Sequence, residues 1–307
     1  DCVELARHEG IDFIVGLGGG SSMDTAKGCN FLLTNGGEMK DYWGVGKASK
    51  PMLPLIAIPT TAGTGSECQS FALISDAVTH AKMACGDPKA MAKVAILDPE
   101  LTLSQPARVT ACTGIDAVAH AVESAVTRKR NETSQQYSRV AFGLLSQSLP
   151  AVLTKPNDLE ARGLMLLGAA FAGTAIEHSM LGAAHSAANP LTAHFDVIHG
   201  QAVGLMLPHV VRFNGEDEDI ARAYAELVTG TTAASINGVP AHESLASLLE
   251  DFMDAAGMPR DLKDCGVDAT KIDLLSEEAA AQWTASFNPR DITASDFKGL
   301  YSRAFGS

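Results

Sequence analysis

Basic charge and long apolar runs are both scarce in this chain of 307 residues. The formal net charge is −13 at pH 7, which argues against a nucleic-acid or anionic-membrane partner, because both favour a basic face. The longest uncharged run, near residues 163–176, is too short to span a bilayer and predicts a buried helix. No signal peptide is visible. We therefore expect a cytoplasmic protein that binds neither membranes nor nucleic acids.

Paired cysteines are also missing. The six cysteines are scattered and form no Cys-x-x-Cys pair, which is typical of reduced thiols rather than of a disulfide framework. The sequence shows no internal repeat and no low-complexity stretch. Its 46% share of hydrophobic residues is enough for a large core, which argues against global disorder. The length suggests two domains.

A glycine-rich loop follows the first apolar run. Residues 13–15 predict a strand that ends in glycines, and Ser21 or Ser22 can cap a helix that reaches about Leu33. This order of elements can hold a phosphate, because glycines permit close approach and a helix N-terminus attracts anions. The loop is neither the Gly-x-Gly-x-x-Gly dinucleotide pattern, because position 21 is serine, nor a Walker A motif. An ordinary turn explains it equally well.

A second loop, rich in hydroxyl groups, follows the next predicted strand. Residues 55–58 are apolar, Pro59 ends the strand, and residues 60–66 read Thr-Thr-Ala-Gly-Thr-Gly-Ser. Open α/β sheets bind ligands at the carboxyl ends of their strands, although a Ser/Thr turn with a cap at Ser66 is the alternative. Further strand-like runs lie at residues 71–75, 82–85 and 94–97.

The periodicity becomes helical from about Ser104. Proline or glycine breaks separate the segments, and an acidic run at residues 216–219 predicts a helix start, where acids suit the helix dipole. We predict helices near residues 105–111, 114–127, 134–149, 158–176, 180–188, 200–213 and 217–228. The expected fold is therefore an α/β region over residues 1–103 followed by an all-helical region over residues 104–307.

Histidines gather among small apolar residues between positions 181 and 209. They are His185, His194, His199 and His209. Neutral imidazole is the commonest metal ligand, although one such histidine alone is more often a hydrogen-bonded core residue.

A carboxylate and an imidazole lie four residues apart in another stretch. Asp116 and His120 would share one helix face. Asp116 could instead form a capping box with Thr113, but capping does not explain a histidine between two alanines. With two imidazoles from the distant stretch, this pair makes a ligand set suited to Fe(II) or Zn(II).

These motifs together resemble the iron-containing (group III) alcohol dehydrogenases. The shared motifs are Gly-x-Asp-Ala-x-x-His at 114–120, His185 and His199 with Ile-His-Gly at the second, Gly-Gly-Gly-Ser-x-x-Asp at 18–24, Pro-Thr-Thr-Ala-Gly-Thr-Gly-Ser-Glu at 59–67 and Asn-Pro-Arg at 288–290. The resemblance implies a dehydroquinate synthase-like architecture. Its first part, 1–103, would be an N-terminally incomplete NAD(P)-binding domain with a parallel sheet, and 104–307 would be a helical, metal-binding catalytic domain.

The resemblance also implies an activity and a set of site residues. The reaction would be hydride transfer between a primary alcohol, or its aldehyde, and NAD(H) or NADP(H), in a homodimer. The metal, Fe(2+) or Zn(2+), would be held by Asp116, His120, His185 and His199. The cofactor would lie against Gly19, Gly20, Ser21, Asp24, Thr60, Thr61, Thr64 and Lys82.

Asn189 departs from the family pattern. Many members have a second histidine four residues after the ligand that matches His185, and it is thought to help proton transfer. Asparagine orients a water or a hydroxyl but cannot titrate. We therefore expect His185 and Asn189 to act in catalysis by binding and orientation, with His178 and His194 as weaker candidates for proton exit.

The start of the chain is the second departure. Relatives carry a further βαβ-type segment before the position of Asp1, which supplies sheet strands and the acid that reads the adenosine ribose. We expect a fragment with an unpaired sheet edge, in which NAD and NADP cannot be distinguished. A glycerol dehydrogenase-like or dehydroquinate synthase-like zinc enzyme, and a metal- or nucleotide-binding protein without turnover, remain as alternatives.

Overall fold

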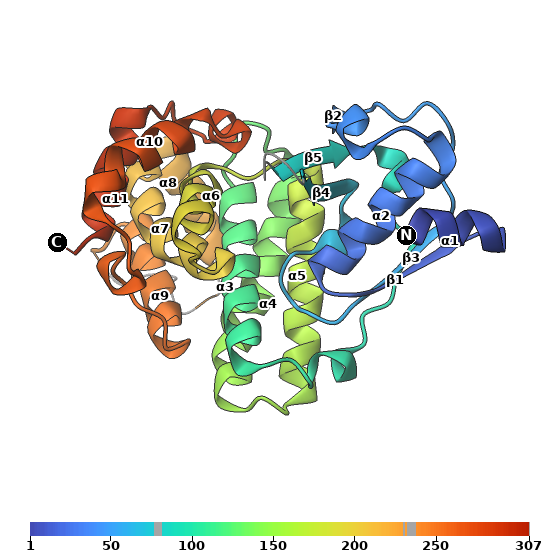
Figure 1. Ribbon diagram of the computed structural model, residues 1–307. Coiled ribbons are helices and arrows are strands. Elements are labelled where there is room, and N and C mark those ends of the chain that lie inside the picture. Colours follow the sequence, from blue (N-terminus) through green and yellow to red (C-terminus); the bar gives the residue numbers. More distant parts are fainter. Residues whose placement is uncertain (77–81, 230, 232–237, 307) are drawn as a thin grey trace.

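Two regions of different architecture follow one another along the chain (Figure 1). The computed structural model describes residues 1–76, 82–229, 231 and 238–306. The strands lie in the first 95 residues, and the remainder of the described chain is helical. The predicted order of an α/β region before a helical region is therefore confirmed.

The first sheet is parallel and has the strand order β1-β3-β6. Its strands are β1 (Ile14–Gly18), β3 (Leu55–Pro59) and β6 (Val94–Ala95). Ile14 pairs with Leu55 and Ile56 with Val94, so the carboxyl ends of β1 and β3 lie side by side. Helix α2 (Gly20–Asn35) packs on this sheet, and α1 (Cys2–Glu9) precedes β1. The last strand is shorter than predicted.

A second small sheet has the order β2-β5-β4. The strand-like runs predicted at residues 71–75 and 82–85 are present as β4 (Phe71–Ser75) and β5 (Lys82–Gly86), which are antiparallel. The short strand β2 (Gly44–Val45) pairs parallel to β5. A compact apolar cluster that includes Phe31, Tyr42 and Met83 joins this sheet to α2.

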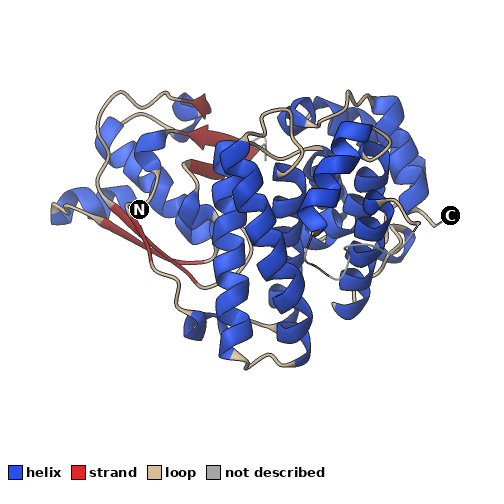
Figure 2. Cartoon of the chain, turned by 180° about the vertical axis from the view of Figure 1, so that it is seen from behind, coloured by secondary structure: helices blue, strands red, loops and turns tan. Residues whose placement is uncertain are grey.

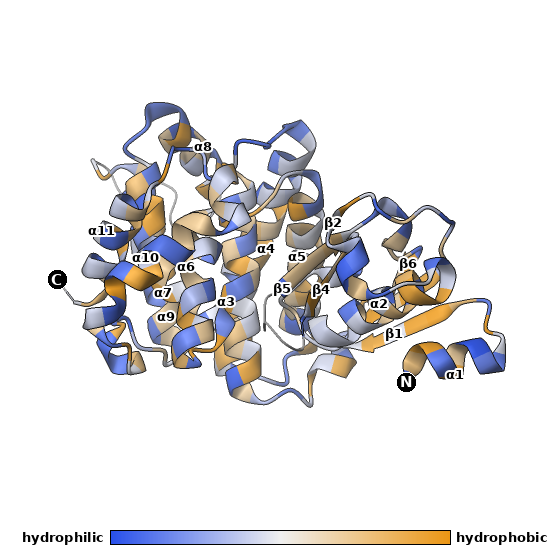
Figure 3. Cartoon of the chain, turned by 45° about the horizontal axis from the view of Figure 1, so that its top comes forward, coloured by the Kyte–Doolittle hydropathy of each residue, from blue (hydrophilic) through white to orange (hydrophobic). Residues whose placement is uncertain are grey.

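One face of the first sheet is apolar and open to solvent. Val15 and Leu17 of β1, together with Val94 and Ile96, are exposed, whereas Leu55 and Ala57 point into the interior. β1 has a strand neighbour on one side only among the described residues, and Figure 3 shows it as a hydrophobic strand, coloured orange, at the edge of the molecule. The predicted unpaired edge is present at β1.

The helical region is built around α3. Figure 2 shows that helices make up most of the molecule outside its few strands. Helix α3 packs against α4, α5 and α7, and its residues from Gly114 to Ser124 are all buried. The helices are α3 (Ala107–Ser124), α4 (Glu132–Thr154), α5 (Leu159–His178), α6 (Ala183–Phe195), α7 (His199–Asn214), α8 (Glu218–Val228), α9 (Ala241–Ala255), α10 (Ile272–Ala281) and α11 (Ala294–Ala304).

Several predicted helix boundaries were wrong because proline and glycine do not break these helices. Pro150 and Pro190 lie inside α4 and α6, and α3 runs unbroken through Gly114. Pro208 lies inside α7, as the predicted helix at residues 200–213 required. A proline inside a helix costs about 3 kcal/mol. Burial of the surrounding apolar side chains, such as Leu191, offsets that cost. The acidic start of α8 is confirmed, because Asp217 caps it through the amides of Asp219 and Ile220.

Helix α5 explains the apolar run that the sequence shows. The helix is longer than the run and meets the length and composition of a membrane span, so the length argument was wrong. However, 61% of its most apolar window is buried inside the protein. It packs against α3 and α4, which confirms the prediction of a buried helix.

Candidate metal centre

Helix α3 supplies a buried carboxylate and a buried imidazole. Asp116 Oδ1 lies 3.4 Å from Nε2 of His120, one turn further along the helix. Because α3 begins at Ala107, Thr113 lies inside the helix, where its hydroxyl donates to the carbonyl of Val109 at 2.9 Å. Asp116 is therefore not part of a capping box.

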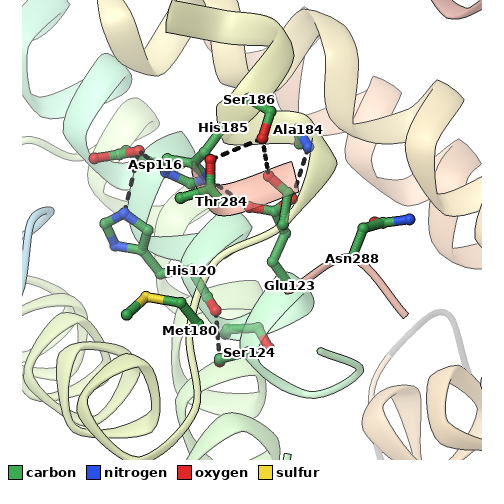
Figure 4. Close-up of polar contacts among 12 residues, drawn as sticks. Asp116, His120, Glu123, Ser124, Met180, Ala184, His185, Ser186, Thr284 and Asn288 are labelled. Atoms are coloured by element: carbon green, nitrogen blue, oxygen red, sulfur yellow. Dashed lines mark hydrogen bonds and ion pairs between the residues drawn. The ribbon is translucent and has the colours of Figure 1, made fainter. Parts of the chain in front are cut away.

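Two further imidazoles reach the same carboxylate from α6 and α7. Nε2 of His185 is 3.3 Å from Asp116 Oδ1, and Nε2 of His199 is 3.8 Å from that oxygen. Figure 4 shows the side chains of Asp116, His120 and His185 pointing toward one another. One ligand atom from each of these three residues lies within 4.8 Å of the other two. The structure thus brings the imidazoles of three predicted metal ligands, His120, His185 and His199, to one oxygen of the fourth, Asp116.

Two atoms at this point are buried and lack a hydrogen-bond partner. They are Asp116 Oδ1 and His185 Nε2. Leaving such groups unpaired is costly in a protein interior. A divalent cation fits the position, because it would satisfy the carboxylate and the imidazole lone pairs together, and three nitrogens with one oxygen suit iron or zinc.

Burial and mutual charge shift the titration of these groups. Burial, opposed in part by Asp116, lowers the pKa of His199 to about 4 and also lowers the pKa of His120. Burial would likewise lower the pKa of His185, but the charge of Glu123 and the contacts with Asp116 and Glu123 raise it to about 9. Burial alone would raise the pKa of Asp116, yet the charge of His120 and the contact with His185 hold it below its usual value. Two of the three imidazoles are thus neutral, as metal ligands must be.

Glu123 belongs to this cluster, although the sequence analysis gave it no role. Its Oε2 lies 2.5 Å from Nδ1 of His185, and its Oε1 accepts the amide of Ala184 at 2.7 Å. Glu123 follows Asp116 by seven residues and His120 by three, which places all three on one helix face. That spacing was the signal that would have revealed it.

Asn189 lies one turn after His185 on α6 and is partly buried. Its Nδ2 donates to Oε1 of Gln282 at 3.0 Å. His194 is exposed and pairs with Glu278 at 2.8 Å, while the carbonyl of His178 accepts from Asn131 at 2.6 Å. None of these contacts joins Asn189, His178 or His194 to the metal ligands.

Two loops lie against each other at the ends of β1 and β3. They are the glycine loop, residues 18–20, and the threonine loop, residues 60–66. The amide of Thr60 donates to the carbonyl of Gly18 at 2.9 Å. A Cβ added at Gly20 would stand 2.7 Å from Thr64 Cγ2, and one at Gly19 would stand 3.4 Å from Thr61. This close approach requires a residue without a side chain at position 20. No side chain caps α2, whose N-cap is Gly19, so the predicted serine cap was wrong.

The other predicted cofactor residues have different surroundings. The hydroxyl of Ser66 donates to Asp24 at 3.0 Å, so Asp24 joins α2 to the threonine loop. Ser21 lines a hollow of about 400 Å³ beside β1. Thr60 Oγ1 accepts from Gln105 at 3.4 Å.

Lys82 at the start of β5 is exposed. Burial raises the pKa of Asp24, and the positive charge of Lys82 opposes that rise. Burial lowers the pKa of His199, and the charge of Lys82 lowers it further. Lys82 therefore lies near both the threonine loop and the candidate metal centre.

Known proteins match this chain over nearly its whole length. The chain is 34% identical to the NAD-dependent methanol dehydrogenase of Bacillus methanolicus over 98% of this chain and 79% of that protein. Among solved structures, a 1,3-propanediol oxidoreductase aligns with a TM-score of 0.93 at 30% identity, covering 99% of this chain and 79% of its own. The sulfoacetaldehyde reductase of Bifidobacterium kashiwanohense, solved with NAD+, aligns with a TM-score of 0.89 at 28% identity, covering 100% and 79% of the two chains.

Two family descriptions divide the chain between them. The sequence model for iron-containing alcohol dehydrogenases matches residues 1–99. The model for the C-terminal part of the Fe-containing alcohol dehydrogenase family matches residues 110–305. The chain belongs to the iron-containing alcohol dehydrogenase family.

Proposed function

We propose that the four-residue cluster on α3, α6 and α7 is the centre at which this enzyme transfers hydride between a primary alcohol, or its aldehyde, and NAD(H). The family is one of metal-dependent alcohol oxidoreductases, so the proposal concerns which residues do the work. The observation that carries it is the convergence of three imidazole nitrogens within 3.8 Å of one carboxylate oxygen.

A divalent ion and a nicotinamide dinucleotide would complete the site. Asp116, His120, His185 and His199 would hold the ion, which when bound supplies a Lewis acid for the substrate oxygen. The dinucleotide supplies the hydride acceptor or donor. The four proposed ligands fit the ion, and the contact between the glycine loop and the threonine loop fits the dinucleotide. NAD is favoured over NADP because the Bacillus methanolicus relative is NAD-dependent and a matched structure holds NAD+.

The cofactor-binding residues are proposed on the contact between the two loops. Gly19 and Gly20 leave room for a pyrophosphate at the N-terminus of α2, where backbone donors favour an anion. Thr60, Thr61 and Thr64 offer hydroxyls beside them. Asp24 accepts a hydrogen bond from the hydroxyl of Ser66 and would hold α2 against the threonine loop. The exposed Ser21 and Lys82 complete the set.

Asn189, one turn after His185 on α6, would orient a water or a substrate hydroxyl. Gln282 already accepts one of its amide hydrogens, so the amide orientation is fixed. Neither Asn189 nor Gln282 carries a titratable proton, and proton exit would pass to solvent by another route.

We also propose a role for each region of the chain, an oligomeric state and a cellular compartment. We assign residues 1–103 to cofactor binding and residues 104–307 to metal binding and catalysis. The family resemblance favours a homodimer in the cytoplasm. All six cysteines are unpaired, which supports a reducing compartment.

Metal content and turnover together test this function. We expect protein purified without added metal to contain iron or zinc and to consume NADH with acetaldehyde, butanal or lactaldehyde. A chelator should abolish consumption, and Fe(2+) or Zn(2+) should restore it. Full activity in metal-free protein would contradict the proposal. Nucleotide binding without turnover in metal-loaded protein would favour the non-catalytic alternative.

A further inference from the structure

A buried glutamate lies directly behind the candidate metal centre. Glu123 is carried by the same helix face as Asp116 and His120, and its side chain is 4% exposed. Its two oxygens make different contacts: Oε2 lies 2.5 Å from Nδ1 of His185, and Oε1 accepts the amide of Ala184 at 2.7 Å (Figure 4). The carboxylate therefore joins the end of α3 to the first turn of α6.

The local backbone is shaped to admit this carboxylate. A Cβ added at Gly182, the N-cap of α6, would stand 3.2 Å from Oε1 of Glu123 and 3.4 Å from Oδ1 of Asn288. Ser186, one residue after the histidine, donates to the carbonyl of Gly182 at 3.0 Å and contacts the hydroxyl of Thr284 at 2.7 Å. The start of α6 is thus held in place around Glu123.

The two contacts of Glu123 place a hydrogen on Nδ1 of His185. A peptide N–H can only donate, so Oε1 must accept, and a carboxylate has no hydrogen to offer through Oε2. Nδ1 of His185 therefore donates to Oε2. The second nitrogen, Nε2, is left facing Asp116 Oδ1 at 3.3 Å without a hydrogen-bond partner.

We propose that Glu123 is a positioning residue, which holds a hydrogen on Nδ1 of His185 and so leaves Nε2 as the nitrogen that binds the metal ion. This inference rests on the proposed function, because it assumes that His185 is a ligand. Carboxylates that accept from the far nitrogen of a ligating histidine fix its orientation and strengthen metal binding. Glu123 acts through His185 and itself touches neither metal nor substrate.

Glu123→Gln tests the assignment with little change of shape. The glutamine amide has one acceptor, so it cannot accept from Ala184 and His185 at once. We expect the affinity of the metal-free protein for Zn²⁺, measured by competition with a chromophoric chelator, to fall by about 10- to 100-fold. Nitrogen NMR of the zinc-loaded wild type should show His185 with its hydrogen on Nδ1, and this signal should be lost or altered in the variant.

Glu278→Gln is the matched control. Glu278 also accepts from a histidine, His194, at 2.8 Å, but this pair lies on the surface. The zinc affinity of the Glu278→Gln variant should equal that of the wild type. Equal affinity in Glu123→Gln as well, with the His185 signal unchanged, would overturn the assignment.

Two further arms keep the result decisive. If Glu123→Gln does not fold, Glu123→Asp takes its place, because the shortened side chain retains the charge but cannot span both contacts. Unchanged zinc affinity in Glu123→Asp would then refute the role. Failure of the wild type to bind zinc, iron or cobalt would instead overturn the proposed metal site, and the two failures are distinguished by the wild-type measurement alone.

Discussion

Each proposed ligand at the metal centre has its own exposure and its own protonation state. His120, His185 and Asp116 have side chains no more than 9% exposed, whereas His199 is 32% exposed. Burial keeps the pKa of His199 at about 4, so its imidazole is neutral at physiological pH. His199 is therefore the ligand whose removal disturbs the packed interior least, and its loss should report on metal binding rather than on folding.

His199→Ala should remove metal binding and activity together. The loss of one of four ligands should cost more than the roughly 10- to 100-fold typical of residues behind a ligand, while the melting temperature of the metal-free protein changes little. Metal analysis and NADH oxidation measured on the same preparation check this. Full activity combined with full metal content would exclude His199 from the site.

Gly20→Ala should separate cofactor binding from metal binding. The new Cβ would stand 2.7 Å from Thr64 Cγ2, so the two loops must move apart and the KM for NADH should rise several-fold, with metal content unchanged. Gly143→Ala in α4 is the control, because nothing lies within 4 Å of its added Cβ. That substitution should stabilise the helix by roughly 0.5–1 kcal/mol and leave the KM as it was.

The threonine loop and helix α5 approach each other backbone to backbone. A Cβ added at Gly173 of α5 would stand 2.3 Å from the carbonyl oxygen of Gly65. Nearby, Ser70 Oγ donates to Oε1 of Glu177 at 2.7 Å. A predicted cofactor loop is thus fixed directly to a helix of the metal-binding region.

Gly173→Ala should destabilise the protein and weaken the cofactor site. Because the clash is with backbone, it cannot be relieved by a side-chain rotation, and overpacking of this kind costs about 1–3 kcal/mol. Urea unfolding should show that loss relative to Gly143→Ala, and the KM for NADH should rise. A stability equal to that of the wild type would mean that the two backbones separate freely.

The parts of the site that lie within one helix were predictable, whereas contacts between helices were not. Asp116 and His120 are one turn apart, so helical spacing alone placed them together. No local pattern places His185 and His199 beside them, and there the resemblance to a family supplied the pairing. Glu123 was overlooked because its partners belong to α6. Pro190 was taken as a helix end because its cost is local while the packing that offsets it is not.

At the scale of the whole molecule, two charged groups are buried in the α/β region, where residues 66–68 pack against helix α5. Lys27 is fully buried and donates to the carbonyl of Ser66 at 2.6 Å and to that of Phe71 at 2.9 Å. Beside it, Glu67 is 3% exposed, and its Oε1 has no hydrogen-bond partner. Burial lowers the pKa of Lys27 to about 8 and raises the pKa of Glu67 to about 7.

These shifts predict a minimum of stability near neutral pH for this pair. Glu67 keeps its proton in the folded state up to about pH 7 but releases it near 4.5 when unfolded, so its stabilisation is lost as the pH rises through that window. Lys27 is lowered from 10.5 to about 8, so its stabilisation is lost as the pH falls from 10.5 to 8.

Glu67→Gln should remove the loss of stability that occurs between pH 4.5 and 7. The difference in unfolding free energy between wild type and variant should change by about 3 kcal/mol between pH 4.5 and 7, as measured by urea unfolding at several pH values. The unfolding free energy of the variant should still rise from pH 8 upward, because Lys27 is present in it. A difference that does not vary with pH would show that Glu67 titrates normally.

The partial exposure of His199 has a consequence for how the enzyme acquires its ion. Three proposed ligands are closed off by helices, so an ion would enter and leave past the fourth. Exchange with the surroundings would then need only the swing of one imidazole and no opening of the helical core. Occupancy in a cell would follow the free concentrations of iron and zinc on a short timescale, and the metal found after purification would record the medium as much as the protein.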